Sequence, residues 1–117
     1  MQWKAATLDD VRAIVKGDLE KCDAEQIATF RQVSVEPYFA PIRRYGKLEK
    51  VVIVARKLND VLYWEDVEEG FNISPLGPDG LILEHWCNQR DLGVALNQWI
   101  EGRSSDGKFF SARPLDS

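Results

Sequence analysis

Hydrophobic residues form a continuous strand-like run near the middle of the chain, at residues 51–55, which read VVIVA. A short run of β-branched residues favours a strand that is covered on both faces of its sheet. Asn59 and Asp60 follow, and both residue types tolerate the left-handed backbone of a tight hairpin turn. We therefore expect a central strand over about 49–57 and a hairpin partner over about 60–67.

Two capping signatures predict helical structure in the first third of the chain. Thr7 and Asp10 have the spacing of a capping box. They precede a stripe of apolar residues at helical spacing, which predicts an amphipathic helix over 8–21. Asp23 begins a second cap signature, which predicts a short turn of helix through Phe30.

A further helix is predicted near the end of the chain. Asn88 is the expected cap, with Asp91 three residues later, and Gly102 is a suitable C-terminal cap. The apolar face of this helix comprises Leu92, Ala95, Leu96, Trp99 and Ile100.

The remaining strands are predicted from alternation. Residues 33–40 alternate, but Pro37 and Pro41 remove backbone donors, so this strand should lie at an edge or be broken. Gly70 indicates a bend or bulge before a further alternating strand. Residues 81–87 are expected to form the last strand of the sheet.

Together these elements predict an α+β two-layer sandwich, in which an N-terminal and a C-terminal helix flank an antiparallel sheet of four to five strands. Residues 1–102 should form one domain. The tail over 103–117 is polar except for Phe109 and Phe110, so it either frays or docks through these two rings. One core is expected to hold Val52, Ile53, Val54, Leu62, Leu83, Leu96 and Trp99.

Charge and composition narrow the choice of partner. The net charge is −4, which argues against nucleic acid, because phosphate binding needs clustered Lys and Arg. The same charge is compatible with a basic protein partner. The sequence has no apolar run of membrane-spanning length and no secretory apolar segment at its start, so we expect a cytoplasmic protein with no membrane partner. In that compartment Cys22 and Cys87 should be free, buried thiols.

The stretch with the most unusual composition, residues 60–69, combines aromatic and acidic residues. Residues 60–69 carry five acidic and no basic side chains, whereas residues 43–57 carry six basic and one acidic. Cross-strand charge pairing at a solvated edge accounts for this most simply. Alternatively, the end of the strand is a protein-binding patch with aromatic anchors and an acidic rim. That patch would consist of Tyr63, Trp64, Glu65, Asp66, Glu68 and Glu69.

A second group of candidate residues is Glu84, His85 and Cys87. Residues two apart on a strand point to one face, and a Cys–His pair can activate a thiolate nucleophile. Leu81 and Leu83 continue that face, however, so we expect His85 and Cys87 to lie buried or half-buried beneath a helix. The chain has one histidine and no phosphate-binding loop or nucleophile elbow. We therefore expect no metal and no cofactor.

These patterns predict a small acidic interaction module that binds a protein partner. A neutraliser of a basic toxin, of the immunity or antitoxin type, is one specific version, and a homodimer is another arrangement. The alternative is a small enzyme or ligand-binding domain with a pocket between sheet and helices, in which His85 acts with Glu84 or Cys87.

Overall fold

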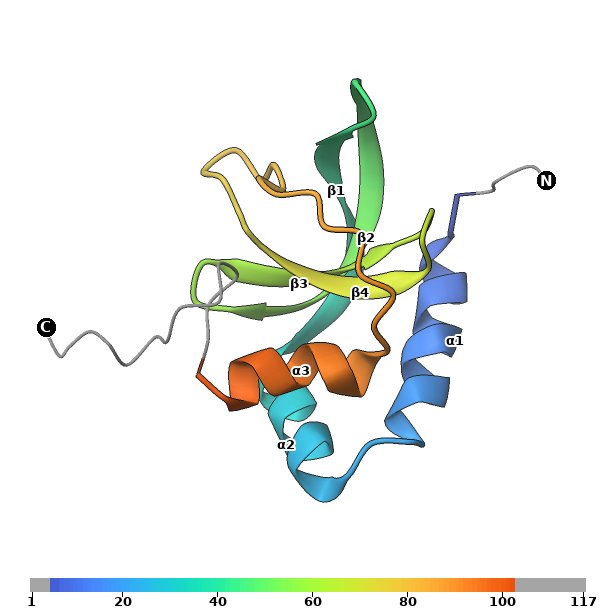
Figure 1. Cartoon of the computed structure of the whole chain (residues 1–117), viewed down its shortest axis with the longest axis vertical. Helices are drawn as coiled ribbons and strands as arrows, with labels where there is room; N and C mark the ends of the chain where they lie inside the picture. The colour runs from blue at the N-terminus through green and yellow to red at the C-terminus, as the bar shows by residue number, and fades with distance from the viewer. Residues whose placement is uncertain (1–4, 103–117) are drawn as a thin grey trace, which may run out of the picture.

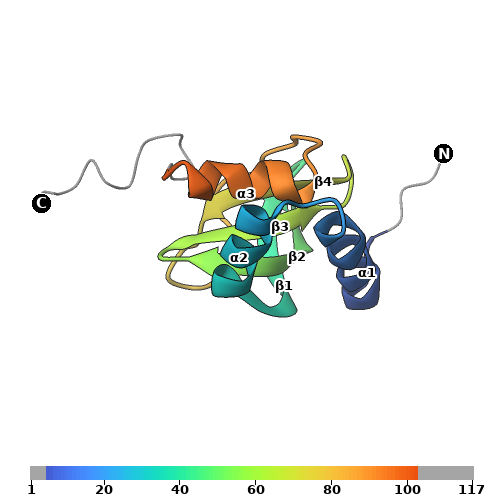
Figure 2. The same cartoon turned by 90° about the horizontal axis from the view of Figure 1, so that it is seen from below.

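In the computed structural model, which describes residues 5–102, four strands form one antiparallel sheet and three helices lie over one of its faces (Figure 1). Seen from below, α2 and α3 lie in front of the strands and α1 lies beside them (Figure 2). In chain order the elements are α1 (Leu8–Leu19), α2 (Ala24–Val33), β1 (Ser34–Arg44), β2 (Lys47–Lys57), β3 (Asp60–Glu65), β4 (Gly70–Pro75) and α3 (Leu92–Ile100). The predicted α+β class is confirmed. The predicted tail, with Phe109 and Phe110, lies outside the described residues.

The sheet is a meander, in which the strands lie side by side in the order β1-β2-β3-β4. The first strand is an edge strand with an irregular register between Ser34 and Tyr38, as its prolines predicted. In the β2–β3 turn, Leu58 takes the left-handed backbone (φ 56°), rather than Asn59 or Asp60. Asn59 instead donates a side-chain hydrogen bond to the Leu76 carbonyl (3.2 Å).

Both predicted N-terminal caps are confirmed. Thr7 and Asp10 form a reciprocal capping box at the start of α1, and Asp23 and Gln26 form a second at the start of α2. The second helix continues beyond the predicted end at Phe30, as far as Val33. Within residues 5–102, no helix has the length and apolar character needed to cross a bilayer.

The last helix begins three residues later than the sequence predicted. Asp91 is the cap of α3, and its carboxylate accepts a hydrogen bond from the Val94 N–H (3.1 Å). Asn88 does not cap the helix, because the Asn72 side chain binds both the N–H and the carbonyl of Asn88. Gly102 has the left-handed backbone (φ 76°) expected of a residue that ends a helix.

The sheet separates two apolar cores, where the sequence predicted one. The core beneath the helices contains Val11, Val52, Val54, Ala55, Leu62, Trp64, Phe71, Ile73, Leu92, Ala95, Leu96 and Trp99. The core on the opposite face contains Ala40, Ile42, Val51, Ile53, Val61, Tyr63, Leu76 and Ile82.

The central strand β2 contributes to both cores, as its apolar run predicted. A register shift between Ile53 and Ala55 places Val54 on the helix side together with its neighbour Ala55. Leu83, in contrast, is 54% exposed, so its predicted place in the core is wrong.

Residues 81–87 do not form the predicted last strand. Only Ile82 makes isolated bridges, to Ile42 and Leu76. Three buried side chains on β3 and β4 hold the segment instead: Tyr63, Asn72 and Ser74. These side chains accept the N–H groups of Glu84, Trp86 and Asn88, so the segment covers the second face of the sheet as an irregular chain.

Gly70 allows this covering segment to pass close to the sheet. It pairs with Glu65 in the regular β3–β4 register, so it does not mark the predicted bulge. A Cβ atom at Gly70 would clash with the Asn88 carbonyl and lie 2.7 Å from the Gln89 Cα. The glycine is therefore required by the close approach of two backbones.

Gly70→Ala should destabilise the fold by about 2 kcal/mol, because either the covering segment or the strand must move. Gly17→Ala is the matched control. Gly17 lies within α1 with nothing within 4 Å of a built Cβ, so alanine should stabilise the protein by about 0.5–1 kcal/mol. Urea unfolding would measure both, and equal stabilities for the two variants would contradict the close approach.

Candidate functional site

The predicted aromatic patch is not at the surface. Tyr63 is 0% and Trp64 is 8% exposed, and β3 lies between β2 and β4 rather than at an edge. Tyr63 belongs to one core and Trp64 to the other, where its ring packs edge-on against Phe71 at 4.8 Å. The prediction of an exposed aromatic edge is therefore wrong.

The acidic residues of the same segment divide into two pairs. Glu65 and Asp66 are buried, whereas Glu69 is exposed and Glu68 is half-buried. The Glu68 carboxylate accepts a hydrogen bond from the side chain of Gln89 (3.3 Å). Of these four acidic residues, only Glu68 and Glu69 reach the surface, where the sequence predicted all of them.

Three of the carboxylates around the hairpin converge on Arg44. Its guanidinium lies 2.6 Å from Glu49, 2.7 Å from Glu65 and 2.9 Å from Asp66, and its side chain is 1% exposed. The basic segment 43–57 and the acidic segment 60–69 therefore do form ion pairs with each other, but these pairs are buried and share one cation, Arg44. The solvated edge that the sequence predicted is therefore replaced by a buried ionic cluster, defined here by these four residues.

The Glu65 carboxylate is surrounded by donors. One oxygen, Oε1, accepts the backbone N–H groups of Val67 (2.7 Å) and Glu68 (3.0 Å). The other, Oε2, lies 2.7 Å from Arg44 and 2.6 Å from His85 Nε2. Burial by itself would raise the pKa of Glu65, but the bonds from Glu68, His85, Arg44 and Val67 lower it below its usual value. Glu65 is therefore a buried carboxylate held in its ionised form.

His85 and Cys87 come together, although not on a strand and not beneath a helix. Cys87 Sγ lies 3.4 Å from His85 Nε2, and the exposed Tyr45 packs edge-on against the imidazole at 5.2 Å. Both are on the sheet face opposite the helices, and Cys87 is exposed rather than buried. Glu84 is not part of this group, because its carboxylate accepts the Trp86 indole N–H (3.1 Å).

The His85–Cys87 pair is poorly arranged for nucleophilic catalysis. A general base must offer a free nitrogen lone pair to the thiol proton. Here the same nitrogen, Nε2, faces both Cys87 and the ionised Glu65, so its hydrogen is donated to the carboxylate. In a catalytic triad the acid and the nucleophile contact different nitrogens of the imidazole.

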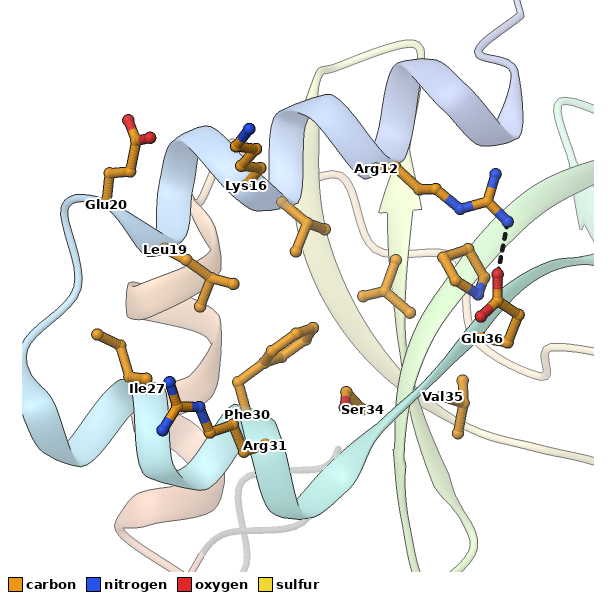
Figure 3. A pocket seen from close by; sticks show the side chains of 13 residues that line it. Arg12, Lys16, Leu19, Glu20, Ile27, Phe30, Arg31, Ser34, Val35 and Glu36 are labelled. Carbon is orange, nitrogen blue, oxygen red and sulfur yellow. Dashed lines mark hydrogen bonds and ion pairs between the residues drawn. The ribbon is translucent and has the colours of Figure 1, made fainter.

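A groove of about 600 Å³ lies between α1, α2 and β1 (Figure 3). Its apolar walls are formed by Val15, Leu19, Ile27, Phe30, Val35 and Pro37, with Val54 of the helix-side core also lining it. The Arg12–Glu36 ion pair (2.7 Å) spans from α1 to β1 at one end. Lys16, Glu20 and Arg31 complete the rim. The sequence did not reveal this groove, because it depends on how two helices and a strand lie relative to one another.

On the other side of α1 there is an acidic depression of about 440 Å³. Asp10, Asp66 and Glu69 contribute its carboxylates, and Trp64 and Ile14 are among its apolar lining residues. Of the six predicted patch residues, three therefore meet at this surface feature: Trp64, Asp66 and Glu69. Helix α1 separates this depression from the groove.

The fold defines a small α+β domain in which a four-stranded meander is covered by three helices on one face. No protein-family model, curated protein or solved structure matched the chain.

Glu65→Gln should cost about 1–3 kcal/mol at pH 7, because Arg44 and the N–H groups of Val67 and Glu68 lose their hydrogen bonds to an ionised acceptor. The lowered pKa of Glu65 sets the pH dependence. Its ionised form contributes stability above the unfolded value of about 4.3, and this contribution is lost as pH falls through the folded pKa. The gap between wild type and Glu65→Gln should therefore narrow below about pH 4.3.

Urea unfolding between pH 7 and pH 3 would measure this gap. Glu25→Gln on the exposed start of α2 is the control and should change stability little at any pH. A Glu65→Gln deficit that stays constant over the whole range would contradict a buried ionised carboxylate.

The two thiols should react at different rates. Cys87 is exposed, whereas burial, with contributions from Asp91, Asp18 and Asp23, raises the pKa of the half-buried Cys22. Because the thiolate is the reactive form, a maleimide should label Cys87 several-fold faster than Cys22 near neutral pH. Mass spectrometry of Cys22→Ser and Cys87→Ser proteins would give each rate separately, and faster labelling of Cys22 would contradict the prediction.

Proposed function

We propose that this chain is a non-enzymatic interaction module that binds a protein partner along α1. The groove between α1, α2 and β1 is the observation that carries the proposal. Its walls are apolar and its floor reaches the core at Val54, so a partner's apolar side chains would be well buried there. Recognition of an apolar helix face or peptide in such a groove is a recurring mode of protein binding.

The dimensions of the groove suit a short segment of a partner. Its α1 wall extends from Arg12 to Glu20, which corresponds to about 12 Å of helix. That length accommodates the apolar side chains of about two helical turns. Charged side chains would contact a bound segment at both ends, since Arg12 and Glu36 pair at one end and Glu20 and Arg31 also line the groove.

The acidic depression supports a basic partner. It lies along the same helix as the groove, so one partner that covers α1 would contact both. A Lys or Arg side chain in the depression would place its stem near Trp64 and its charge near Asp66 and Glu69. The net charge of −4 would accelerate encounter with such a partner.

A protein that neutralises a basic toxin, of the immunity or antitoxin type, is a specific version of this proposal. It fits a small acidic module whose His85–Cys87 pair is poorly arranged for nucleophilic catalysis. A cytoplasmic location fits the free thiols Cys22 and Cys87, since that compartment keeps thiols reduced. A second copy of the chain is another partner that the groove would accept.

The alternative, a small enzyme or ligand-binding domain, would depend on His85 and the exposed Cys87, which lie 3.4 Å apart. Neither residue lines the groove, and nor does Glu84. The predicted pocket between sheet and helices and the predicted reactive residues therefore belong to opposite faces of the sheet.

Ile27→Glu tests the groove directly. Ile27 lines the groove but is not among the residues packed on the helix-side core, so the charge should weaken binding without unfolding the protein. A loss of about 2 kcal/mol or more in binding is expected if it contacts an anchor of the partner. Val94→Glu on α3, at a residue 49% exposed, is the matched control and should bind normally.

The partner would be identified by affinity capture with quantitative mass spectrometry, comparing wild type with Ile27→Glu and Val94→Glu. Binding of the purified partner would then be measured. Equal capture by all three proteins would overturn the groove as the contact surface. Analytical ultracentrifugation of the chain alone would show whether a second copy occupies the groove.

The acidic depression is tested by Glu69→Lys, with Glu25→Lys as the control for the same charge change away from α1. The first variant should slow association more than the second, and the difference should shrink as salt rises. Association rates at two ionic strengths would measure this. Equal slowing by both variants would mean that only net charge matters.

A further inference from the structure

We propose that Cys87 and His85, with Glu65 behind them, form a binding site for Zn²⁺ or a similar thiophilic divalent cation. One ligand atom from each of these residues lies within 4.8 Å of the other two. A thiolate, an imidazole and a carboxylate are the three side-chain types that bind zinc in proteins. The site is on the sheet face opposite the partner-binding groove, so it is independent of the proposed function.

The distance between the two principal ligands suits a tetrahedral ion. Zinc bonds to sulfur and nitrogen of normal length at a tetrahedral angle separate the two atoms by about 3.5 Å. Cys87 Sγ and His85 Nε2 lie 3.4 Å apart, so their separation already suits a shared ion. Glu65 Oε2 is closer to Nε2, at 2.6 Å. An ion would therefore replace that hydrogen bond, and the imidazole would move outward by less than about 1 Å.

The backbone that carries these ligands is held in place from the sheet. The Trp86 N–H donates to the Tyr63 hydroxyl (2.8 Å), which lies 3.2 Å from the Glu84 carbonyl. The Asn72 side chain binds both the N–H and the carbonyl of Asn88, the residue that follows Cys87. His85 and Cys87 are therefore fixed on either side of an anchored residue, and this preorganisation favours metal binding.

Within its own four residues, the neighbouring ionic cluster has more negative than positive side chains. Glu49, Glu65 and Asp66 are three carboxylates around the single guanidinium of Arg44. A dication beside Glu65 would reduce this excess in a poorly solvated region, where charges interact strongly. Arg44 shares Oε2 of Glu65, so the carboxylate would be the weakest of the three ligands. Cys87 and His85 would therefore determine the affinity.

The site is open on its outer side. Cys87 is exposed, and the Tyr45 hydroxyl lies 4.0 Å from its sulfur. Three protein ligands with one open position are typical of zinc sites that keep a water molecule or a ligand from another molecule in the fourth position.

Cobalt and zinc titrations test the site. The untagged chain, stripped with a chelator and reduced with a phosphine, would be titrated with Co²⁺ and then with Zn²⁺ in a calorimeter. We expect one ion per chain, a thiolate-to-cobalt charge-transfer band in the near ultraviolet, and a melting temperature that rises with Zn²⁺. The ligands of the ion can be identified by substitution, because the chain has one histidine and two cysteines.

Cys87→Ser should abolish the charge-transfer band. Both Cys87→Ser and His85→Asn should weaken Zn²⁺ binding at least about tenfold. Cys22→Ser is the control and should keep both the band and the affinity. Because Cys87 is exposed, Cys87→Ser should fold normally, which its melting temperature without metal would verify. Absence of the band, unchanged binding in Cys87→Ser, or one ion shared by two chains would each overturn the proposal.

Discussion

The buried ion pair between Arg44 and Glu65 connects the sheet with the segment that carries His85. Arg44 ends β1, and Glu65 ends β3, so the pair joins the first hairpin to the middle of the sheet. Both side chains are at most 1% exposed, and loss of Arg44 would leave Glu65 and Asp66 in the interior without the cation that they share. Glu65 also binds the turn that follows it and the imidazole of His85. One carboxylate thus positions a cation, a turn and a surface histidine.

The two faces of the sheet are covered by different kinds of interaction. Helices cover one face through apolar packing, and the space left between α1 and α2 forms the groove. An irregular segment covers the other face, where Tyr63, Asn72 and Ser74 supply hydrogen bonds from the strands. Polar anchors allow the second face to carry His85 and Cys87 at defined positions. The chain therefore separates the apolar groove from the polar pair of His85 and Cys87.

Local patterns were sufficient for the helices, the central hairpin and the α+β class. The capping boxes of Thr7 and Asp23 and the apolar run of β2 depend only on neighbouring residues. The failures concern partners far away in sequence. Residues 81–87 alternate like a strand, but Tyr63 and Asn72 bind the 84–88 backbone instead of a neighbouring ladder.

The candidate site was harder to predict for the same reason. Glu65 and Asp66 look like surface residues until Arg44, about twenty positions earlier, is placed beside them. The groove depends on how α1 and α2 lie relative to each other, which neither helix encodes alone.

The meander has a consequence for folding kinetics. Each strand pairs with its sequence neighbour, so the sheet closes only short loops, whereas the bond from Leu92 N–H to Asp18 (2.9 Å) spans 74 residues. Loop-closure entropy thus favours early formation of the sheet and late docking of the first and last helices on each other.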